Sequence, residues 1–493
     1  MKSIIISFTL CCTLGAAAEK PNILFFLVDD MGWQETSVAF HTEPTQLNRD
    51  YHTPNMERLV SSGGMMFTNA YAASVCSPSR TSLMTGWNAA RHKVTCWTLK
   101  KDASPENVPA GFSAADWPLN GLQPVGSNVP HSVEAPTLPQ LLREAGYKTI
   151  HAGKAHWGAK DTPGADPKNL GFDVNIAGNF LGGPGSYYGE KNFSARSRNG
   201  GDIWDVPGLE KYHGQEINLT EAITREAIAA LTKTVKEEKK PFYLYMSHYT
   251  IHVPWDADKR FIGKYQGKPA YAKPENKAAL ASMIESMDHS LGDLMDTLEK
   301  LGVADNTIIV FMSDNGSPQQ CQPNLPLRGW KISGYEGGTR VPMIVKVPGI
   351  TKGVRTRTPI IIEDIFPTFL QWARVKNIPE NDGVSFTEIL KNPSTNRSKR
   401  PLFWHYPNFY GDPPFSSVRL GDLKLIYWHK DQRLELFNLA NDLGEKHNLA
   451  ASRQNDVKRL AKVLADHLRK TKAVMPIVKA TGKPVPLPDE VNG

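Results

Sequence analysis

The sequence predicts an α/β fold in which helices flank a large, mostly parallel central sheet, followed by a smaller C-terminal α+β unit that carries an antiparallel sheet. Continuous apolar runs, such as residues 22–28 and 307–312, lead into acidic residues and are typical of strands buried on both faces. Helical segments separate these runs, and such alternation favours helices on both faces of a sheet. After residue 400, short strand-like segments precede one helix, which favours a separate antiparallel unit.

The first 312 residues contain four strand-like runs and three helical segments. The strands are expected at residues 22–28, 147–151, 241–246 and 307–312. The helices are expected at residues 138–145, 221–235 and 277–301. Thr137 and Thr220 precede the first two helices as capping residues, and Gly146 and Gly302 end the first and the third.

Two long segments, 100–135 and 157–214, interrupt this alternation and are rich in Gly, Pro, Asn and aromatic residues. Insertions of this length in a compact domain are usually binding loops or disordered segments. Their aromatic side chains either wall a carbohydrate pocket or anchor the loops to the core, and the sequence leaves both readings open. The side chains in or beside the insertions are Trp97, Trp117, Trp157, Tyr187, Tyr188 and Trp204.

The polar stretch 391–400 is expected to be a linker or an exposed turn. It divides the chain into a large domain at 19–390, which is expected to carry the chemistry, and a C-terminal α+β subdomain at 391–493. Within the second part, strand-like segments are expected at 401–406, 417–420 and 424–428, and a helix at 455–470.

The composition is that of a globular protein, because 40% of the 493 residues are apolar and 22% are charged. Residues 1–18 read as a secretory signal peptide, since Lys2 precedes an apolar run and Ala16 to Ala18 form a small-residue cleavage site. No later stretch is long and apolar enough to span a bilayer. We therefore expect a periplasmic or secreted protein without a membrane anchor.

Charge and cysteines are less informative. The formal net charge is +7, and charge runs such as 236–240 read as solvated helix ends, so no nucleic-acid partner is expected. Cys11 and Cys12 lie in the predicted signal peptide. In an oxidising compartment, Cys96 and Cys321 are a possible disulfide.

Acidic residues follow two of the predicted strands. Asp29 and Asp30 come directly after residues 22–28, and Asp314 and Asn315 follow residues 307–312. Ligands of open α/β sheets bind beyond the carboxyl ends of the strands, so these four side chains are expected to converge. Three carboxylates and an amide favour a hard cation, Ca²⁺ or Mg²⁺, over zinc. Read singly, adjacent aspartates more often cap a helix or lie in a solvated turn.

The most specific motif is CSPSRTSLMTG, residues 76–86. Pro78 is expected in the first turn of a helix, which would place Cys76 where free backbone N–H groups favour an anion. A lone cysteine is usually a small buried hydrophobe. The complete string, however, resembles the site at which type I sulfatases of the alkaline phosphatase superfamily convert a cysteine into formylglycine.

The resemblance covers nearly the whole mature chain. Residues 146–156, GYKTIHAGKAH, resemble the second sulfatase signature, and residues 247–254, SHYTIHVP, resemble the segment that faces the leaving group. Residues 435–449 are similar to a C-terminal family segment, with Leu443 where proline is common. The resemblance implies an alkaline phosphatase-like fold, bound Ca²⁺ with Mg²⁺ as the alternative, and Cys76 modified to 3-oxoalanine (formylglycine) by a maturation enzyme.

The resemblance also implies a mechanism. The hydrated aldehyde formed from Cys76 would attack sulfur with one hydroxyl, which also joins the metal ligands, and would expel sulfate when the other hydroxyl loses its proton. His248 is expected to pack rather than to react. The remaining roles implied are activation of the nucleophile by Arg80, binding of sulfate by Lys154 and Lys331, assistance to the leaving alcohol by His252, and proton removal by His156.

The expected function is hydrolysis of a sulfate monoester, with S–O cleavage, on a sulfated mono-, oligo- or polysaccharide. Galactose or N-acetylgalactosamine is the sugar suggested by analogy. A phosphodiesterase or phosphonate hydrolase of the same superfamily is one alternative, and a glycan-binding protein with an unmodified Cys76 is another. The presence of both lysines and both histidines favours an enzyme, because a binding protein needs no acid for a leaving group.

Overall fold

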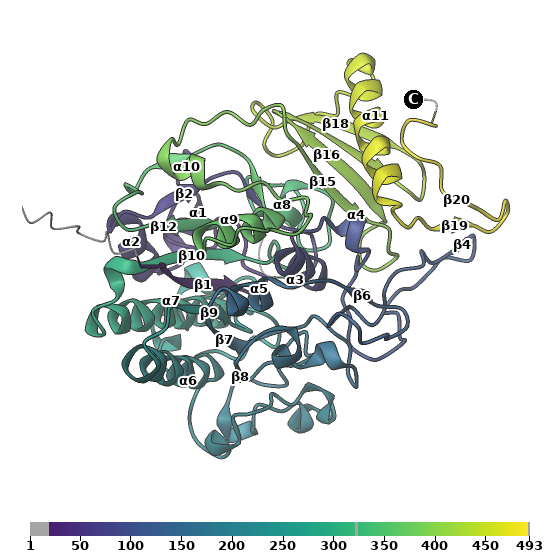
Figure 1. The fold of residues 1–493 in the computed structure, drawn as a ribbon. Helices are drawn as coiled ribbons and strands as arrows, with labels where there is room; N and C mark the ends of the chain where they lie inside the picture. The colour runs from purple at the N-terminus through teal and green to yellow at the C-terminus, as the bar shows by residue number, and fades with distance from the viewer. Residues whose placement is uncertain (1–18, 321–323, 492–493) are drawn as a thin grey trace, which may run out of the picture.

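The structure, a computed structural model, describes residues 19–320 and 324–491. Its centre is an eight-stranded sheet (Figure 1). In order across the sheet, the strands are β13 (Arg355–Thr356), β2 (Met65–Phe67), β12 (Met343–Lys346), β10 (Thr307–Ser313), β1 (Asn22–Val28), β9 (Phe242–Ser247), β7 (Lys148–Gly153) and β8 (Val174–Ile176). The strands from β10 to β8 run parallel, whereas β12 is antiparallel to β10 and β2. The prediction of a mostly parallel sheet is confirmed.

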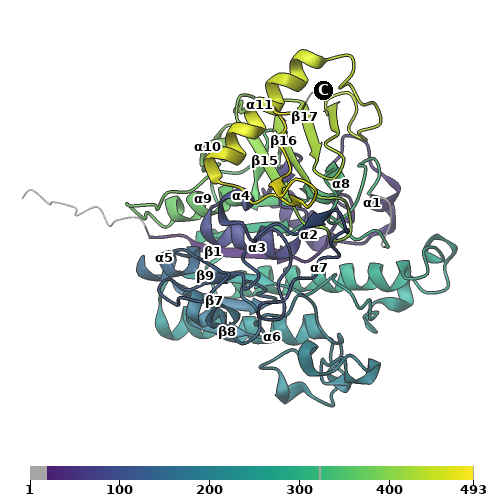
Figure 2. The ribbon, with the colours of Figure 1, turned by 90° about the vertical axis from the view of Figure 1, so that its right-hand side faces the viewer.

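β1 lies inside the sheet because its residues are apolar on both faces. Ile23, Phe25 and Leu27 pack into one core cluster, and the alternate residues Leu24 and Phe26 pack into another. Helices cover both faces of the sheet (Figures 1 and 2). One group comprises α3 (Cys76–Thr85), α5 (Leu138–Glu144) and α9 (Ile365–Trp372), and the other comprises α2 (Pro54–Ser61), α6 (Leu219–Lys233) and α7 (Lys277–Lys300).

The strands and helices predicted in the first 312 residues are all present, with ends displaced by at most two residues. The insertion at 100–135 holds the short strands β4 (Phe112–Ser113), β5 (Leu122–Gln123) and β6 (Val133–Glu134). β4 pairs with β19 (Ile477–Val478), which also pairs with β20 (Lys483–Pro484). A further small sheet contains β11 (Arg340–Val341), β3 (Ala70–Tyr71) and β14 (Ile360–Ile361). The short helices are α1 (Gln46–Asp50), α4 (Ala89–His92), α8 (Glu336–Thr339) and α10 (Thr387–Lys391).

The C-terminal sheet is antiparallel, as predicted, and α11 (Gln454–Thr471) packs on it (Figure 2). Its strands are β15 (Pro401–Tyr406), β16 (Phe415–Leu420), β17 (Leu423–Trp428) and β18 (Leu434–Asn438). α11 buries the stripe Leu460, Leu464 and Leu468 in a core that also contains Leu425 of β17. The sequence predicted the first three strands and the helix but missed β18.

A buried ion cluster joins this sheet to the main sheet domain. Lys424 of β17 places Nζ 3.0 Å from a carboxylate oxygen of Glu336 in α8 and 3.0 Å from one of Glu445, and all three side chains are fully buried. Burial raises the pKa of Glu445 to about 7, although Lys424 opposes this. A hydrophobic core cluster that contains Tyr71 and Trp404 also spans the two units. The predicted boundary at residues 390 and 391 stays a prediction.

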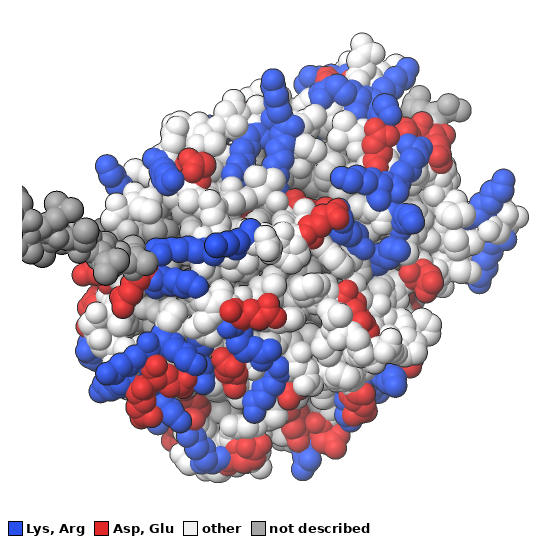
Figure 3. Space-filling view, viewed as in Figure 1, with Lys and Arg blue, Asp and Glu red and all other residues white. Residues whose placement is uncertain are grey.

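Some sequence predictions fall outside the described residues. These are the signal peptide at 1–18 and Cys321. Cys96 is buried, with its Sγ 3.8 Å from the hydroxyl of Tyr406, and its pairing with Cys321 stays a prediction. Within the described residues, no helix has the length and apolar character needed to cross a membrane. On the face shown in Figure 3, acidic side chains lie among the basic ones over much of the surface.

Candidate active site

Three buried carboxylates meet where β1 and β10 end. These strands are parallel neighbours with Val28 opposite Ser313, so the residues that follow them emerge side by side. Asp29, Asp30 and Asp314 each offer one oxygen, and these oxygens all lie within 4.8 Å of one another. The backbone N–H of Asp30 donates to Asp314 Oδ1 at 3.1 Å. The structure thus brings together the three carboxylates that the sequence predicted to converge.

Asn315 adds an amide to this group, and the residues present fit a hard cation. Its Nδ2 donates to Asp30 Oδ1 at 2.7 Å, while its own Oδ1 and Asp29 Oδ1 are buried without a hydrogen-bond partner. Burial raises the pKa of Asp29 well above its ordinary value; Lys154 opposes this shift, whereas Asp314 and Asp30 add to it. A cation such as Ca²⁺ or Mg²⁺ would relieve the repulsion among the carboxylates and satisfy both unpaired oxygens.

Cys76 is the first residue of α3, and Val75 precedes it as an extended N-cap residue. The helix predicted from Pro78 is present and begins two residues earlier. All residues of α3 are buried, and Cys76, 3% exposed, lies on the wall of a cavity. Burial raises the pKa of its thiol against the lowering effects of Lys154 and Lys331. A thiol with a raised pKa is a poor nucleophile at neutral pH.

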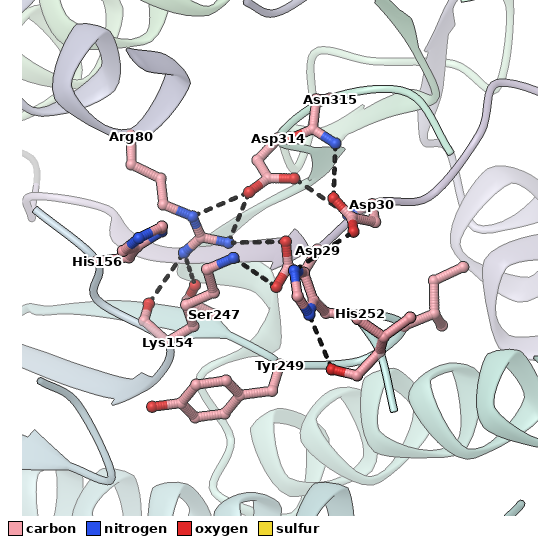
Figure 4. A network of polar contacts seen from close by, with 12 residues as sticks. Asp29, Asp30, Arg80, Lys154, His156, Ser247, Tyr249, His252, Asp314 and Asn315 are labelled. Carbon is pink, nitrogen blue, oxygen red and sulfur yellow. Dashed lines mark hydrogen bonds and ion pairs between the residues drawn. The ribbon is translucent and has the colours of Figure 1, made fainter. Parts of the chain in front are cut away.

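Arg80 lies one turn further along α3 and connects this helix to the carboxylates (Figure 4). Its Nε and Nη2 contact Asp314 Oδ2 at 2.9 Å and 2.8 Å. Nη1 donates to the carbonyl oxygen of Lys154 at 3.0 Å and to Ser247 Oγ at 2.7 Å. Nη2 is also 3.9 Å from Asp29 Oδ1. The fully buried planar guanidinium therefore fixes α3 against the ends of β7, β9 and β10.

Two lysines flank the carboxylates. Lys154, directly after β7, is fully buried with Nζ 2.7 Å from Asp29 Oδ2. Lys331, between β10 and α8, lines the cavity and places Nζ 2.6 Å from Asp30 Oδ1. Burial alone would raise the pKa of Asp30, but Lys331 and His252 outweigh it and hold that pKa below its ordinary value. Both lysines that the sequence singled out therefore lie beside the carboxylates.

His252 lies on the cavity wall, with Nε2 3.8 Å from Asp30 Oδ2 and Nδ1 2.9 Å from the carbonyl oxygen of Val253. Tyr187, from the insertion at 157–214, supports this loop. Its hydroxyl lies 2.6 Å from the carbonyl oxygen of Tyr249 and 2.8 Å from that of His252. Burial lowers the pKa of His252 to about 3, although Asp30 opposes this. The imidazole is therefore neutral near neutral pH.

His156 lines the same cavity and has a positive φ of 58°. Its Nε2 lies 2.7 Å from the carbonyl oxygen of Thr98, and its Nδ1 is buried without a hydrogen-bond partner. Burial lowers its pKa well below the ordinary value. Gly182 and Gly183 let the chain approach both histidines, because their Cβ atoms would lie 2.8 Å from the ring of His156 and 2.5 Å from that of His252. Sequence reasoning missed these glycines, which belong to no motif.

The cavity has a volume of about 790 Å³, which is in the range typical of sites for small molecules. The candidate residues that line it are Asp30, Cys76, His156, His252 and Lys331. Aromatic side chains form much of the remaining wall, namely Trp97, Trp204, Trp255, Trp330 and Tyr410. Such side chains present flat apolar faces together with a polar atom. The cavity can therefore receive a ring with both apolar and hydroxylated surfaces directly above Cys76.

Some of the insertion aromatics line the cavity and others anchor the loops, while the expectation that the cavity takes a carbohydrate stays a prediction. Trp97 and Trp204 line the cavity. Trp117 and Trp157 are buried instead, and Trp157 stacks on Phe172 with ring centroids 5.8 Å apart. Wall formation and loop anchoring are therefore divided among these residues.

Other wall residues lie outside the two insertions and were missed. Trp255 and Trp330 are neighbours in sequence of His252 and Lys331, which is the signal that could have found them. His248 contacts Ser290 Oγ of α7 at 2.8 Å and is fully buried, so it packs as expected.

Comparison with known proteins agrees with this geometry. The model of a family described as Sulfatase matches residues 21–375, and one described as N-sulphoglucosamine sulphohydrolase, C-terminal, matches residues 330–474. A protein named Sulfatase from Formosa agariphila is 28% identical over 492 residues, covering 88% of this chain and 85% of that protein. N-acetylgalactosamine-6-sulfatase from Homo sapiens is 28% identical over 457 residues, covering 88% and 77%.

A solved structure is similar over the same extent. The crystal structure of Ps i-CgsB in complex with k-i-k-neocarrahexaose has a TM-score of 0.72 and 26% identity, covering 91% of this chain and 93% of that chain. Since the first family model alone spans well over half of the residues, the family assignment does not depend on any single relative. The chain belongs to the sulfatase family of the alkaline phosphatase superfamily and is a sulfuric ester hydrolase.

Proposed function

We propose that this protein is an exported sulfatase that hydrolyses a sulfate monoester on a carbohydrate and uses a formylglycine formed from Cys76. The observation that carries the proposal is the position of Cys76, at the N-terminus of a buried helix, beneath an aromatic-walled cavity and beside three carboxylates. The signal peptide at 1–18, the division into 19–390 and 391–493, and the maturation enzyme form part of the same proposal.

The chemistry of the site supports modification of Cys76. The pKa of its thiol is raised mainly by burial, so the unmodified residue is a weak nucleophile here. As a hydrated formylglycine, the same residue supplies one hydroxyl to attack sulfur and a second whose deprotonation expels sulfate. The first turn of α3 also directs free backbone N–H groups towards an anion at this position.

Asp29, Asp30, Asp314 and Asn315 would hold the cation, with Ca²⁺ proposed and Mg²⁺ the alternative. It would supply positive charge that lowers the pKa of a hydroxyl and polarises the oxygens of the sulfate. Arg80 keeps two of these carboxylates and α3 in fixed register through its buried guanidinium.

The lysines and histidines serve the substrate. Lys331 lines the cavity and Lys154 is paired with Asp29 at the same group of carboxylates, and the proposal assigns both to neutralising charge on the sulfate oxygens. Nδ1 of His252 faces the carbonyl oxygen of Val253, so Nε2 carries a proton for the leaving alcohol only in the imidazolium form, which the negative charge of a bound sulfate would favour. His156 accepts the proton of the second hydroxyl at Nδ1, the nitrogen that has no hydrogen-bond partner.

The proposed substrate is a sulfated galactose or N-acetylgalactosamine, free or within an oligosaccharide, a polysaccharide or a glycosaminoglycan. The aromatic wall of the cavity supports a sugar. The human relative is named for N-acetylgalactosamine-6-sulfate, and the Ps i-CgsB structure contains a neocarrahexaose. These names guide the choice of substrates to test.

Mass spectrometry of the peptide that carries Cys76 tests the proposal most directly. An aldehyde at this residue that reacts with a carbonyl reagent is expected, and an intact thiol in active enzyme would refute the mechanism. In parallel, the purified protein and its Cys76→Ala variant are assayed on a panel of sulfated sugars and matched phosphate esters. Sulfate release by the wild type alone is expected, whereas a preference for phosphate would indicate the phosphodiesterase alternative.

A further inference from the structure

The cavity above Cys76 is poor in positive charge. Among the described residues that line it, Lys331 is the sole lysine or arginine, and its Nζ is already 2.6 Å from Asp30 Oδ1. The neighbouring residues 321–323, which the structure does not describe, are Cys, Gln and Pro and carry no basic group. In the proposed function Lys331 serves the sulfate that reacts, and the described wall offers no second basic side chain for another anion.

An acidic residue of the C-terminal unit also lines this cavity, and its side chain is hydrogen-bonded to Ser333. This residue, Asp412, lies on the cavity wall, in a tight turn between β15 and β16 where Tyr410 and Asp412 form an isolated bridge. Gly411 between them has a φ of +71°, and a Cβ there would lie 2.9 Å from the side chain of Ile332. The turn is therefore packed against Ile332, the residue that follows Lys331, and Asp412 and Lys331 line the same cavity.

The chemistry of this wall suits an uncharged sugar. Hydroxyl groups donate hydrogen bonds to a carboxylate, and such charge-assisted bonds are stronger than neutral ones. The rings of Trp97 and Tyr410 meet edge to face at 5.6 Å and provide an apolar surface beside Asp412. A uronic acid carboxylate or a second sulfate at this wall would meet a like charge without a basic partner, which is a strong means of excluding a ligand.

We propose that the cavity selects an uncharged sugar unit that bears a single sulfate, linked to a neutral neighbour, and that Asp412 is a specificity-determining residue. Asp412 accepts hydrogen bonds from the sugar hydroxyls and disfavours substrates with a second anion in the cavity. This inference rests on the proposed function, because it specifies which sulfated carbohydrate the same site accepts.

Arg198 places a positive charge next to the main cavity but outside its lining. It is exposed and lines an adjoining depression of about 250 Å³, which shares Trp204 and His252 with the main cavity. A second anion on a long substrate could reach that depression without entering the main cavity. The experiment therefore includes a variant of Arg198 as well as one of Asp412.

Three substrates that share the same sulfated sugar provide the test: one linked to a neutral sugar, one linked to a uronic acid, and one with a second sulfate on the same ring. For the wild type, we expect kcat/KM to be at least about tenfold higher on the neutral substrate. Asp412→Asn should lower kcat/KM on the neutral substrate and reduce the preference for it about tenfold. Asp305→Asn is the matched control and should leave the preference unchanged. Asp305 is exposed and precedes β10, so it lies at the end of that strand opposite to the site.

Circular dichroism and melting temperature of each variant separate loss of folding from loss of recognition. The inference is overturned if the wild type shows equal or higher kcat/KM on the uronic acid or disulfated substrate. It is also overturned if folded Asp412→Asn keeps the full preference, or if Arg198→Ala removes a preference for a second anion. Failure of the proposed function looks different: no sulfate is released from any sulfated sugar, while a matched phosphate ester is hydrolysed.

Discussion

Replacing Arg80 by lysine tests whether the several donors of the planar guanidinium, rather than its positive charge alone, keep the carboxylates and α3 in position. The guanidinium makes two contacts with Asp314 and donates to the carbonyl of Lys154 and to Ser247 Oγ, all at 2.7–3.0 Å. A lysine ammonium keeps the charge and can retain one contact with Asp314. It cannot span the other partners, because its three donors radiate from a single atom.

The structure sets the expected magnitude. Arg80 is fully buried, so solvent does not replace the lost partners. Loss of about two hydrogen bonds from a charged donor, with a carbonyl and a hydroxyl left to find other partners, should lower the free energy of unfolding by about 2–4 kcal/mol. Because Asp314 and Asp29 would lose their fixed position, kcat/KM should fall by about 10²–10³ or more.

Urea unfolding monitored by circular dichroism gives the stability change, and sulfate release gives kcat/KM. Arg469→Lys is the matched control, since Arg469 makes a bidentate pair with Asp489 at 2.7 Å on the surface. That change should leave both quantities nearly unaltered because exposed ion pairs contribute little. If Arg80→Lys were as stable and as active as the wild type, the argument that the guanidinium fixes the carboxylates would be wrong.

Chelation of divalent cations should lower the melting temperature and abolish activity, and added Ca²⁺ should restore both. A ligand at 100 times its Kd stabilises the folded state by about 2.7 kcal/mol, which is the reason for the change in melting temperature. An unchanged melting temperature together with full activity would exclude a bound cation. Burial lowers the pKa of His248 to about 3, so below about pH 6.5 the unfolded chain binds a proton there that the folded chain does not. Stability contributed by neutral His248 is therefore present above that pH and lost below it. In urea titrations, the free energy of unfolding of the wild type should fall, relative to that of His248→Gln, by about 1.4 kcal/mol per pH unit between about pH 6.5 and 3. Parallel curves of unfolding free energy against pH for the two proteins would contradict this. Lys424→Met should lower the free energy of unfolding in urea by about 3–5 kcal/mol, because it leaves the buried carboxylates of Glu336 and Glu445 without their lysine partner. The control Lys462→Met, at an exposed residue, should change this free energy little. Equal effects of the two changes would show that the buried ion pairs do not stabilise the fold.

The central strands could be predicted because local sequence and final environment agree. Residues 22–28 are apolar throughout, and the strand is buried on both faces between neighbours on each side. β18 shows the opposite case. Its Glu435 points into the structure, where Tyr335 and Trp428 donate to the same carboxylate oxygen at 2.8 Å and 2.9 Å. A charged residue inside a strand breaks the apolar pattern, and its partners are unknown until the chain folds.

The position of the carboxylates could be predicted for a similar reason. Asp29 and Asp314 follow regular strands, and parallel neighbours deliver their ends to one edge of a sheet. The supports of the histidines could not be predicted in this way. Gly182 and Gly183 matter because the insertion passes within reach of His156 and His252. That approach depends on the path of an irregular loop.

The same division applies to the cavity as a whole. The three carboxylates, Lys154 and Arg80 lie on, or directly next to, strands and the buried helix α3, which hold them rigidly. Groups that face the rest of the substrate lie on loops, which can vary without disturbing that frame. Asp412 combines both properties, because it lies in a turn of the C-terminal unit whose Gly411 is packed against Ile332, next to Lys331. A change in this turn can therefore alter which sugar is accepted while the contacts of Arg80 and the carboxylates remain as they are.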